Sequence, residues 1–279
     1  MGTERVVVVT GGGMGIGKEI ARAFARAGDR LVLCGRTRAP LQQAAAEVST
    51  FEGQVTTAQC DVSRNDSVTR FVGETVRAHG RIDVLVNNAG VYGPIGTAVE
   101  NDPEAWLQAL EINLFGVFLM THHVAPVMIR QGGGAIINLS GGGATSPKPR
   151  YSAYASAKSG VVRFTEICAI ELAEHAIRVN AIAPGFIATR LHDETIAAAG
   201  PDAEAVRRKV EQGGDDPAQA AELAVFLAGP EAEGINGKLF SAIWDDWKGT
   251  QTQAALRRSP ELYTLRRIDD LMFKEVEKK

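Results

Sequence analysis

Residues 6–17 read Val-Val-Val-Val-Thr-Gly-Gly-Gly-Met-Gly-Ile-Gly, and this stretch decides the fold. Four β-branched residues in a row are typical of a buried strand in a parallel sheet. Residues 18–28 follow with apolar side chains at helical spacing. A strand that enters a helix through Gly11, Gly15 and Gly17 is typical of a phosphate-binding turn, because the backbone can approach a pyrophosphate and the helix N-terminus offers free N–H groups. The alternative, an ordinary flexible turn, needs neither the strand before it nor the helix after it.

The composition limits the classes of protein to which the chain can belong. Its 279 residues are 45 % hydrophobic, which is enough for a sizeable core. The net charge of −3 gives no electrostatic basis for binding nucleic acid or an anionic membrane surface. The sequence shows no basic and apolar leader and no apolar run of about 20 residues, so we expect no membrane segment.

The cysteines and histidines indicate neither disulfides nor a metal site. Cys34 and Cys60 lie in strand-like segments, and the three cysteines lack metal-like spacing. His122 and His123 lie in an apolar helical pattern without a third ligand nearby. We therefore expect a protein of the reducing cytoplasm that holds no metal.

Strand-like runs alternate with helical patterns along the whole chain. Strands are expected at Val6–Thr10, Arg30–Cys34, Gln54–Gln59, Asp83–Asn87, Ala135–Leu139, Ile177–Ile182 and, with a weaker signal, Lys238–Ile243. Helices are expected at 15–28, 38–50, 64–79, 103–131, 151–175, 203–212 and 217–228. This alternation predicts an α/β protein with a Rossmann-type, doubly wound parallel sheet of about seven strands. Without an internal repeat or a linker, a single domain is expected; we place it at 1–248, followed by a C-terminal extension at 249–279.

Small, polar or glycine-rich segments follow three of the expected strands. They are 87–90, 140–145 and 183–189. In a doubly wound sheet the ligand binds beyond the carboxyl ends of the strands, where the strand order reverses. Each segment alone could be a tight turn, but together they indicate a cofactor cleft.

Tyr154 and Lys158 form the pair best suited to proton transfer. They are four residues apart, so they share one face of the expected helix. A cation beside a phenol favours the phenolate, so Lys158 and a positively charged oxidised nicotinamide would lower the pKa of Tyr154 from about 10. Tyr154 would then act as a general acid/base near neutral pH. The alternative is a solvated helix face.

The chain resembles the short-chain dehydrogenase/reductase family in the order and spacing of its motifs. These run from about residue 5 to 242 and comprise Thr10-Gly-x-x-x-Gly-x-Gly17, Asp61-Val62, Asn87-Asn-Ala-Gly90, Asn113, Tyr154-x-x-x-Lys158 and Pro184-Gly185 with Thr189. The resemblance implies a seven-stranded dinucleotide-binding domain, a nicotinamide cofactor, and the oxidation of an alcohol or reduction of a carbonyl. It also implies a homodimer or homotetramer built on the helices around 103–131 and 151–175, the second of which is apolar on more than one side.

The resemblance assigns a role to each matching residue. Tyr154 would be the acid/base, and Lys158 would hold the nicotinamide ribose and lower the tyrosine pKa. Asn113 would hold a water that relays the proton, Asp61 would meet the adenine, and Thr189 would meet the carboxamide. The predicted cofactor-binding residues are Gly11, Gly13, Met14, Gly15, Ile16, Gly17, Arg36, Asp61, Val62, Asn88, Ala89, Gly90, Tyr154, Lys158, Pro184, Gly185, Ile187 and Thr189.

The catalytic serine of the family has no clear counterpart at the expected position of this sequence. The family's serine, which holds the substrate oxygen, lies thirteen residues before the tyrosine, and here that position is Gly141. Ser140 would take the role if the following loop were one residue longer, and it is our predicted fourth catalytic residue beside Asn113, Tyr154 and Lys158. Ser146 and Ser152 are the alternatives.

The cofactor is expected to be NADP, with NAD as the alternative. An acidic residue after the second strand would bind the adenosine 2′-hydroxyl and select NAD, but Gly35 and Arg36 stand there instead. A guanidinium matches a phosphate with paired donors. The alternative is a solvent-facing arginine.

The substrate and the C-terminal extension are less defined. The substrate is expected under the segment 186–214, where Arg190 could meet an acidic group, and Trp106, Arg150 and Tyr151 could line the pocket. Trp244, Trp247, Tyr263 and Arg266 could complete that pocket or a subunit contact; the alternative is a tail packed on its own subunit. The favoured function is an NADP-linked oxidoreductase, and the alternatives are an NAD-linked dehydrogenase and a weakly catalytic dinucleotide-binding sensor or scaffold.

Overall fold

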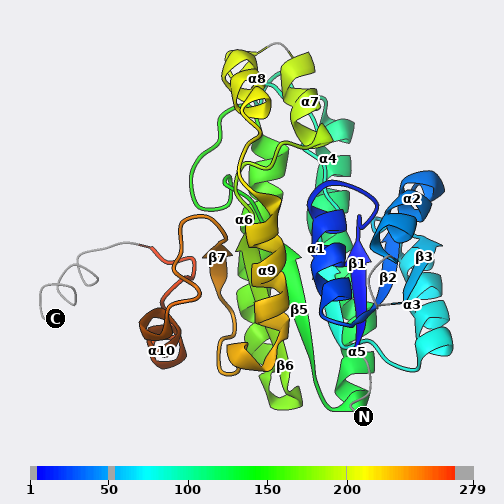
Figure 1. Ribbon diagram of the computed structural model, residues 1–279. Helices are drawn as coiled ribbons and strands as arrows, with labels where there is room; N and C mark the ends of the chain where they lie inside the picture. The colour runs from blue at the N-terminus through cyan, green and yellow to red at the C-terminus, as the bar shows by residue number, and fades with distance from the viewer. Residues whose placement is uncertain (1–4, 50–53, 199, 268–279) are drawn as a thin grey trace, which may run out of the picture.

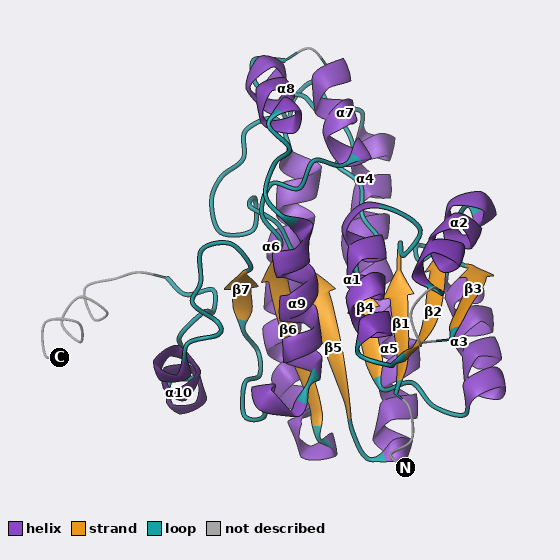
Figure 2. Ribbon diagram, in the orientation of Figure 1, coloured by secondary structure: helices purple, strands orange, loops and turns teal. Residues whose placement is uncertain are grey.

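A computed structural model describes residues 5–49, 54–198 and 200–267 of the chain. Its centre is a parallel sheet of seven strands in the order β3-β2-β1-β4-β5-β6-β7 (Figures 1 and 2). The strands are β1 (Val6–Thr10), β2 (Arg30–Gly35), β3 (Val55–Gln59), β4 (Val84–Asn87), β5 (Gly134–Leu139), β6 (Ile177–Ala183) and β7 (Leu239–Ser241). The predicted doubly wound sheet is confirmed, and the strand order reverses between β1 and β4.

Ten α-helices are described. They are α1 (Gly15–Arg26), α2 (Arg38–Val48), α3 (Asn65–His79), α4 (Pro103–Leu110), α5 (Gly116–Gln131), α6 (Ser152–Glu171), α7 (Arg190–Ala197), α8 (Ala203–Glu211), α9 (Pro217–Ala228) and α10 (Thr250–Arg258). The shorter turns are the π turn η1 (Glu111–Phe115) and the 3-10 turns η2 (Ala173–His175) and η3 (Pro230–Ala232).

The helices cover both faces of the sheet, because β1 is apolar on both sides. Val7 and Val9 belong to the core that α1, α2 and α9 complete. Val6 and Val8 belong to the core on the other face, under α3, α5 and α6. Figure 1 shows α7 and α8 beyond the carboxyl ends of the strands, where the predicted ligand segments emerge.

Several element boundaries differ from the sequence-based expectation. The helix expected at 103–131 is divided into α4, η1 and α5, with the Gly116 N–H donating to the Glu111 carbonyl. The helix expected at 151–175 ends at Glu171. The chain then turns at Ala176 with φ +55°, a left-handed conformation that is usually taken by glycine, so the sequence did not indicate this helix end. The seventh strand is shorter than expected, and α10 was not predicted. Residue 50 of the expected helix at 38–50, and residues 268–279 of the extension, lie outside the described residues.

One helical run, Pro103–Gln131, is long and apolar enough to cross a membrane by length and composition. In its most apolar window, however, 61 % is buried inside the protein, as in the core helix of a soluble domain. Its apolar character therefore reflects the packing of α5 against the sheet, and it is weak evidence for a membrane span.

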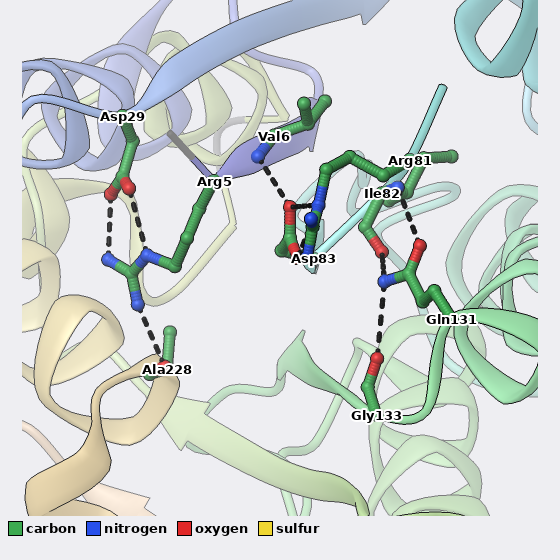
Figure 3. A network of polar contacts seen from close by, with 9 residues as sticks. All are labelled: Arg5, Val6, Asp29, Arg81, Ile82, Asp83, Gln131, Gly133 and Ala228. Atoms are coloured by element: carbon green, nitrogen blue, oxygen red, sulfur yellow. Dashed lines mark hydrogen bonds and ion pairs between the residues drawn. The ribbon is translucent and has the colours of Figure 1, made fainter. Parts of the chain in front are cut away.

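Polar contacts close the amino ends of the strands, opposite the ligand segments (Figure 3). The Arg5 guanidinium donates to both carboxylate oxygens of Asp29 at 2.8 Å and to the Ala228 carbonyl at 3.0 Å. Asp83 accepts from the Val6 N–H at 2.8 Å and pairs with Arg81. These contacts join β1, β2, β4 and α9 at the end of the sheet that carries no predicted site residue.

Candidate active site

The predicted cofactor residues other than Tyr154 and Lys158 lie at or just beyond the carboxyl ends of five strands. The turn after β1 contains Gly11, Gly13 and Met14, and the first turn of α1 contains Gly15, Ile16 and Gly17. The others follow later strands: Arg36 after β2, Asp61 and Val62 after β3, Asn88, Ala89 and Gly90 after β4, and Pro184, Gly185, Ile187 and Thr189 after β6. They therefore line one edge of the sheet, on either side of the point where the strand order reverses.

The glycine turn is held by the segment after β4. The Asn88 side-chain amide donates to the Thr10 and Gly11 carbonyls at 2.9 and 3.2 Å. The Thr10 hydroxyl oxygen accepts from the Asn88 and Ala89 N–H groups at 2.9 and 3.0 Å. The turn and the β4 segment therefore form one rigid wall of the cleft.

The glycines of this turn are required for different structural reasons, which are close packing at one position and a positive φ at two others. A Cβ on Gly17 would lie 2.4 Å from the Asn88 Nδ2 and 2.5 Å from the Gly11 carbonyl oxygen, so packing within the protein requires Gly17. Gly11 and Gly15 have φ of +64° and +52°, which glycine adopts without strain. A Cβ on Gly15 would approach the Thr189 methyl to 3.2 Å, so the turn faces the segment after β6 there.

The first turn of α1 has the properties of an anion site. Met14 is its N-cap, no side chain in the described part of the chain caps the helix, and its first turn contains no acidic residue. The free N–H groups and the positive end of the helix dipole therefore point to the cleft without a competing carboxylate. The residues present fit a dinucleotide phosphate.

The adenosine side of the cleft is formed after β2 and β3. The Asp61 Oδ1 accepts from the Ser63 N–H at 3.0 Å and the Ser63 hydroxyl at 2.7 Å, which orients the carboxylate. Val62 is buried, and a Cβ on Gly116 would approach its methyl to 2.8 Å, so α5 packs closely on it. The Arg36 side chain is exposed, and its backbone carbonyl accepts from Gln59 at 3.1 Å.

Tyr154 and Lys158 lie in the first two turns of α6, both buried. The Lys158 Nζ donates to the Leu139 carbonyl at 2.7 Å and lies 5.7 Å from the Tyr154 ring centroid. Burial lowers the pKa of Lys158 to about 8 and raises the pKa of Tyr154 to about 12. Lys158 alone thus does not produce the lowered tyrosine pKa expected from the sequence, because desolvation of the phenolate outweighs the distant ammonium.

Asn113 lies within the π turn and is fully buried. Its Nδ2 donates to the Val91 and Ala109 carbonyls at 2.8 Å each, and its Oδ1 accepts from the Val91 N–H at 3.1 Å. A Cβ on Gly90 would lie 2.7 Å from that Oδ1 and 3.6 Å from the Lys158 Nζ. Both amide hydrogens of Asn113 are engaged, so its side chain joins the β4 segment to α4 rather than donating to a relay water.

The structure distinguishes between the candidate serines. A Cβ on Gly141 would lie 2.2 Å from the Tyr154 hydroxyl oxygen, so a serine at this position would displace the tyrosine. Ser140 is buried, and its hydroxyl has no hydrogen-bond partner among the described residues. Ser152 accepts from the Trp106 indole N–H at 3.0 Å, and Ser146 is exposed. Ser140 is therefore the candidate with a free hydroxyl beside the residue that contacts Tyr154.

The segment after β6 forms the side of the cleft that faces the glycine turn, where a Cβ on Gly15 would approach Thr189. Gly185 has φ +92°, and a Cβ there would lie 2.5 Å from Ile243. The Phe186 N–H donates to the Asp215 carboxylate at 2.6 Å, and Ile187 is bridged to Gly214. Pro184 is buried, and Thr189 is the N-cap of α7. These contacts place the segment opposite the glycine turn.

A cluster of aromatic residues beside Tyr154 was not predicted as a unit. The Tyr92 ring lies 5.0 Å from Tyr154 and 5.2 Å from Tyr151 between centroids, and its hydroxyl is 2.9 Å from the His192 Nδ1. The Tyr151 hydroxyl donates to Thr195 at 3.0 Å, so two hydrogen bonds hold α7 over the cluster. Three of the four tyrosines of the chain gather here. Tyr92 is far from the other two in the sequence, so the spacing of the tyrosines along the chain did not indicate the cluster.

The described part of the C-terminal region, up to residue 267, packs against α9 and β7. Trp247 is buried against Phe226 at 5.5 Å, and Tyr263 packs on Phe240 at 5.3 Å. The Leu239 N–H donates to the Tyr263 carbonyl at 2.7 Å, so the extension covers the outer edge of β7. These contacts favour the alternative of a tail packed on its own subunit for Trp247 and Tyr263; Arg266 pairs with Glu166 on α6, and Trp244 is exposed.

Two other residues expected to line the pocket contact the start of α6 and the segment 186–214. Trp106 binds Ser152 through its indole, and the Arg150 guanidinium lies against Gly200, where a Cβ would approach it to 2.6 Å. The side chain of Arg190 lies outside the described residues. Within the described residues, no group of three or more His, Cys, Asp or Glu side chains could hold a metal ion.

Comparisons with known proteins agree with this geometry. The family model of the short chain dehydrogenases matches residues 5–199. A short chain dehydrogenase/reductase of Aspergillus oryzae is 35 % identical over 240 residues, which are 84 % of this chain and 91 % of that protein. The solved actinorhodin polyketide ketoreductase with NADPH is 33 % identical, with a TM-score of 0.77 and coverage of 85 % of this chain and 95 % of that chain. The NAD+-bound xylitol dehydrogenase is 27 % identical, with a TM-score of 0.80 and coverage of 85 % and 96 %. The chain belongs to the short-chain dehydrogenase/reductase family of oxidoreductases.

Proposed function

We propose that the protein is an oxidoreductase that uses NADP(H) to interconvert an alcohol and a carbonyl compound, with Tyr154 as general acid/base. The observation that carries this proposal is the position of the Tyr154 hydroxyl. It lies against Gly141, just after the carboxyl end of β5, and its ring centroid is 5.7 Å from the Nζ of buried Lys158. Ser140, the residue before Gly141, has a buried hydroxyl without a partner among the described residues. When bound, the nicotinamide supplies or accepts the hydride.

Tyr154 supplies the proton in carbonyl reduction. Burial raises its pKa to about 12, so the phenol is protonated at neutral pH and can donate from its hydroxyl to the substrate oxygen. In the direction of alcohol oxidation the phenol must lose its proton, and a second positive charge beyond Lys158 is needed to lower its pKa. The positive charge of an oxidised nicotinamide, if bound beside Tyr154, would lower that pKa.

Lys158 and Ser140 position the other reacting groups. Lys158 donates one N–H to the Leu139 carbonyl and keeps two for the ribose hydroxyls of the cofactor. Ser140 has a buried hydroxyl without a protein partner in the described chain, so it is free to donate to the substrate oxygen. Asn113 contributes by fixing the segment after β4 against α4.

NADP is the proposed cofactor, and Arg36 is the residue that would bind its 2′-phosphate. Arg36 is exposed directly after β2, and no acidic side chain follows that strand to select NAD. Relatives solved with NADPH and with NAD+ share this fold, so the preference rests on Arg36 and the missing acid.

A cytoplasmic homodimer or homotetramer is the proposed assembly. Phe115, Phe118, Ile167 and Ile170 are exposed on η1, α5 and α6, and such an apolar face is typical of a subunit contact. The extension covers the outer edge of β7, which favours self-association through α5 and α6. The three cysteines are free and buried, as a reducing compartment allows.

Tyr154→Phe tests the proposed function. We expect kcat with NADPH and a panel of neutral ketones to fall by about 10²- to 10⁴-fold, while the Kd of NADPH changes little. Tyr263→Phe, on the extension, is the matched control and should behave as wild type. A Tyr154→Phe variant with wild-type kcat would overturn the proposal.

A further inference from the structure

Lys148 lies in the loop between β5 and α6, and its ammonium is surrounded by the tyrosine cluster. The Lys148 Nζ is 4.0 Å from the Tyr151 ring centroid, 4.7 Å from that of Tyr92 and 5.7 Å from that of Tyr154. Three aromatic faces around one cation attract it through their quadrupoles. The loop thus brings a positive charge to the side chain that carries the proposed proton transfer.

This cation lacks a carboxylate partner. Among the described residues, Lys148 makes no ion pair or hydrogen bond, and Asp202 is the acid that attracts it from a greater distance. Burial lowers the pKa of Lys148 more than Asp202 raises it. A partly desolvated cation without a counter-ion is costly, and an arriving anion would remove that cost.

Besides Lys148, the charged groups that act on the cluster are Glu194 toward Tyr92, and Asp202 and Arg150 toward Tyr151. Among the described residues, Lys148 is the cation seated on the tyrosine rings themselves, at 4.0 Å from the Tyr151 centroid. The pKa of His192 is lowered to about 4, by burial first and then by Lys148, so His192 is neutral at pH 7. Lys209 lies over Phe186, at 5.3 Å from its ring centroid, on the outer side of the stacked His192. Lys158 lies at the same 5.7 Å from the Tyr154 centroid but is directed to the Leu139 carbonyl.

We propose that Lys148 binds a carboxylate of the substrate, so that the substrate pair is an oxo acid and the corresponding hydroxy acid. This inference rests on the proposed function, because the carbonyl of the acid would lie at the Tyr154 hydroxyl. The carboxylate itself is unchanged by the reaction, and its role is to fix the carbonyl relative to Tyr154 and Ser140. The rings of Tyr92 and Tyr151 would cover the carbon chain between the two groups.

Calorimetric binding in the presence of oxidised NADP tests the proposal without turnover. The probes are 3-oxobutanoate and 4-oxopentanoate, each compared with its neutral amide. Wild type should bind at least one acid about tenfold more tightly than its amide, because the carboxylate of the acid would form an ion pair with the partly desolvated Lys148 and the amide could not. Lys148→Met, which keeps the length of the side chain, should abolish that difference and leave amide binding unchanged.

The control is Lys248→Met, which removes an exposed lysine that pairs with Glu222 on the surface. It should keep the preference for the acid. Equal binding of acid and amide by wild type, binding of neither, or an unchanged preference in Lys148→Met would overturn the proposal. A failure of the proposed function is recognised separately, because NADPH would then not bind or no neutral ketone would be reduced.

Discussion

The two ends of the parallel sheet are built in opposite ways. At the amino ends, charged side chains meet partners of opposite sign and backbone groups, as in the Arg5–Asp29 pair and the contacts of Asp83 (Figure 3). At the carboxyl ends, Ser140 has a buried hydroxyl without a partner in the described chain, and Lys148 is a cation without a carboxylate. One sheet therefore has satisfied contacts at the amino ends of β1, β2 and β4 and unsatisfied groups after the carboxyl end of β5.

This difference separates stability from function within one sheet. Buried polar groups are normally hydrogen-bonded, and an unpaired one reduces stability. The network around Arg5 and Asp83 stabilises β1, β2 and β4, which form one sheet with the strand β5 that carries Ser140. A ligand that satisfies the carboxyl end is the physical reason for keeping those groups there.

The largest effect is expected from Gly17→Ala at the carboxyl end of β1. The added Cβ would lie within 2.5 Å of the Gly11 carbonyl and the Asn88 amide, so the turn and the β4 segment must separate. NADPH affinity, measured by calorimetry, should fall by about 100-fold or more. Gly73→Ala in α3 is the matched control, because a Cβ there meets nothing within 4 Å. Unchanged NADPH binding by Gly17→Ala would contradict the rigid-turn interpretation.

A smaller effect on kcat is expected from Ser140→Ala. Loss of a donor to the substrate oxygen should lower kcat by at least about tenfold, toward the 10²-fold typical of such donors. The free energy of unfolding should stay the same or rise, because the variant removes a buried hydroxyl that has no protein partner in the described chain. Ser146→Ala changes an exposed hydroxyl and should alter neither quantity. If kcat is unchanged in Ser140→Ala, Ser140 has no part in the reaction.

The pH dependence of NADPH affinity tests whether the protonated side chain of Lys158 binds the cofactor. Its folded pKa of about 8 lies below the 10.5 of an ordinary lysine, so raising the pH through 8 removes its proton in the free protein. NADPH affinity should therefore be constant below about pH 8 and then fall, by up to tenfold per pH unit. In the same range the free energy of unfolding contributed by this group rises, because the unfolded state binds more protons. Lys158→Met should bind weakly and without this pH dependence; a flat wild-type profile would exclude Lys158 from cofactor binding.

The smallest kinetic effect is expected at the other end of the sheet. Asp83→Ala leaves the Val6 N–H and Arg81 without their acceptor, and should lower the free energy of unfolding by about 1–3 kcal/mol in urea denaturation. Both kcat and the Kd of NADPH should remain at wild-type values. Asp66→Ala removes an exposed pair with Arg64 and should change neither stability nor kinetics. A large fall in kcat for Asp83→Ala would contradict the separation of the two ends.

The sequence was sufficient to predict the parts of the molecule that depend on local pattern. The β1 strand, the glycine turn and α1 are adjacent in the chain, and Tyr154 and Lys158 are one helical turn apart, so their relation follows from helix geometry. The doubly wound parallel sheet and the segments after its strands followed from the alternation of strands and helices, whereas the strand order was not predicted.

The rest depended on contacts between distant residues. Tyr92 and His192 are 100 positions apart, and only the folded chain shows that they bond over Tyr154. The use of both amide hydrogens of Asn113, and the burial that raises the pKa of Tyr154, also arise from tertiary packing. The aromatic residues near the C-terminus were expected either to complete the pocket or a subunit contact or to pack on their own subunit. Only the folded chain shows Trp247 against Phe226 of α9 and Tyr263 against Phe240 of β7.

Titration of the purified protein with NADPH and with NADH tests the central claim, that the glycine turn and the segments after β4 and β6 bind a nicotinamide dinucleotide. The account predicts that both bind at the same site and that NADPH binds more tightly, because Arg36 meets the 2′-phosphate. Tighter binding of NADH would contradict the role of Arg36, and binding of neither would contradict the claim itself.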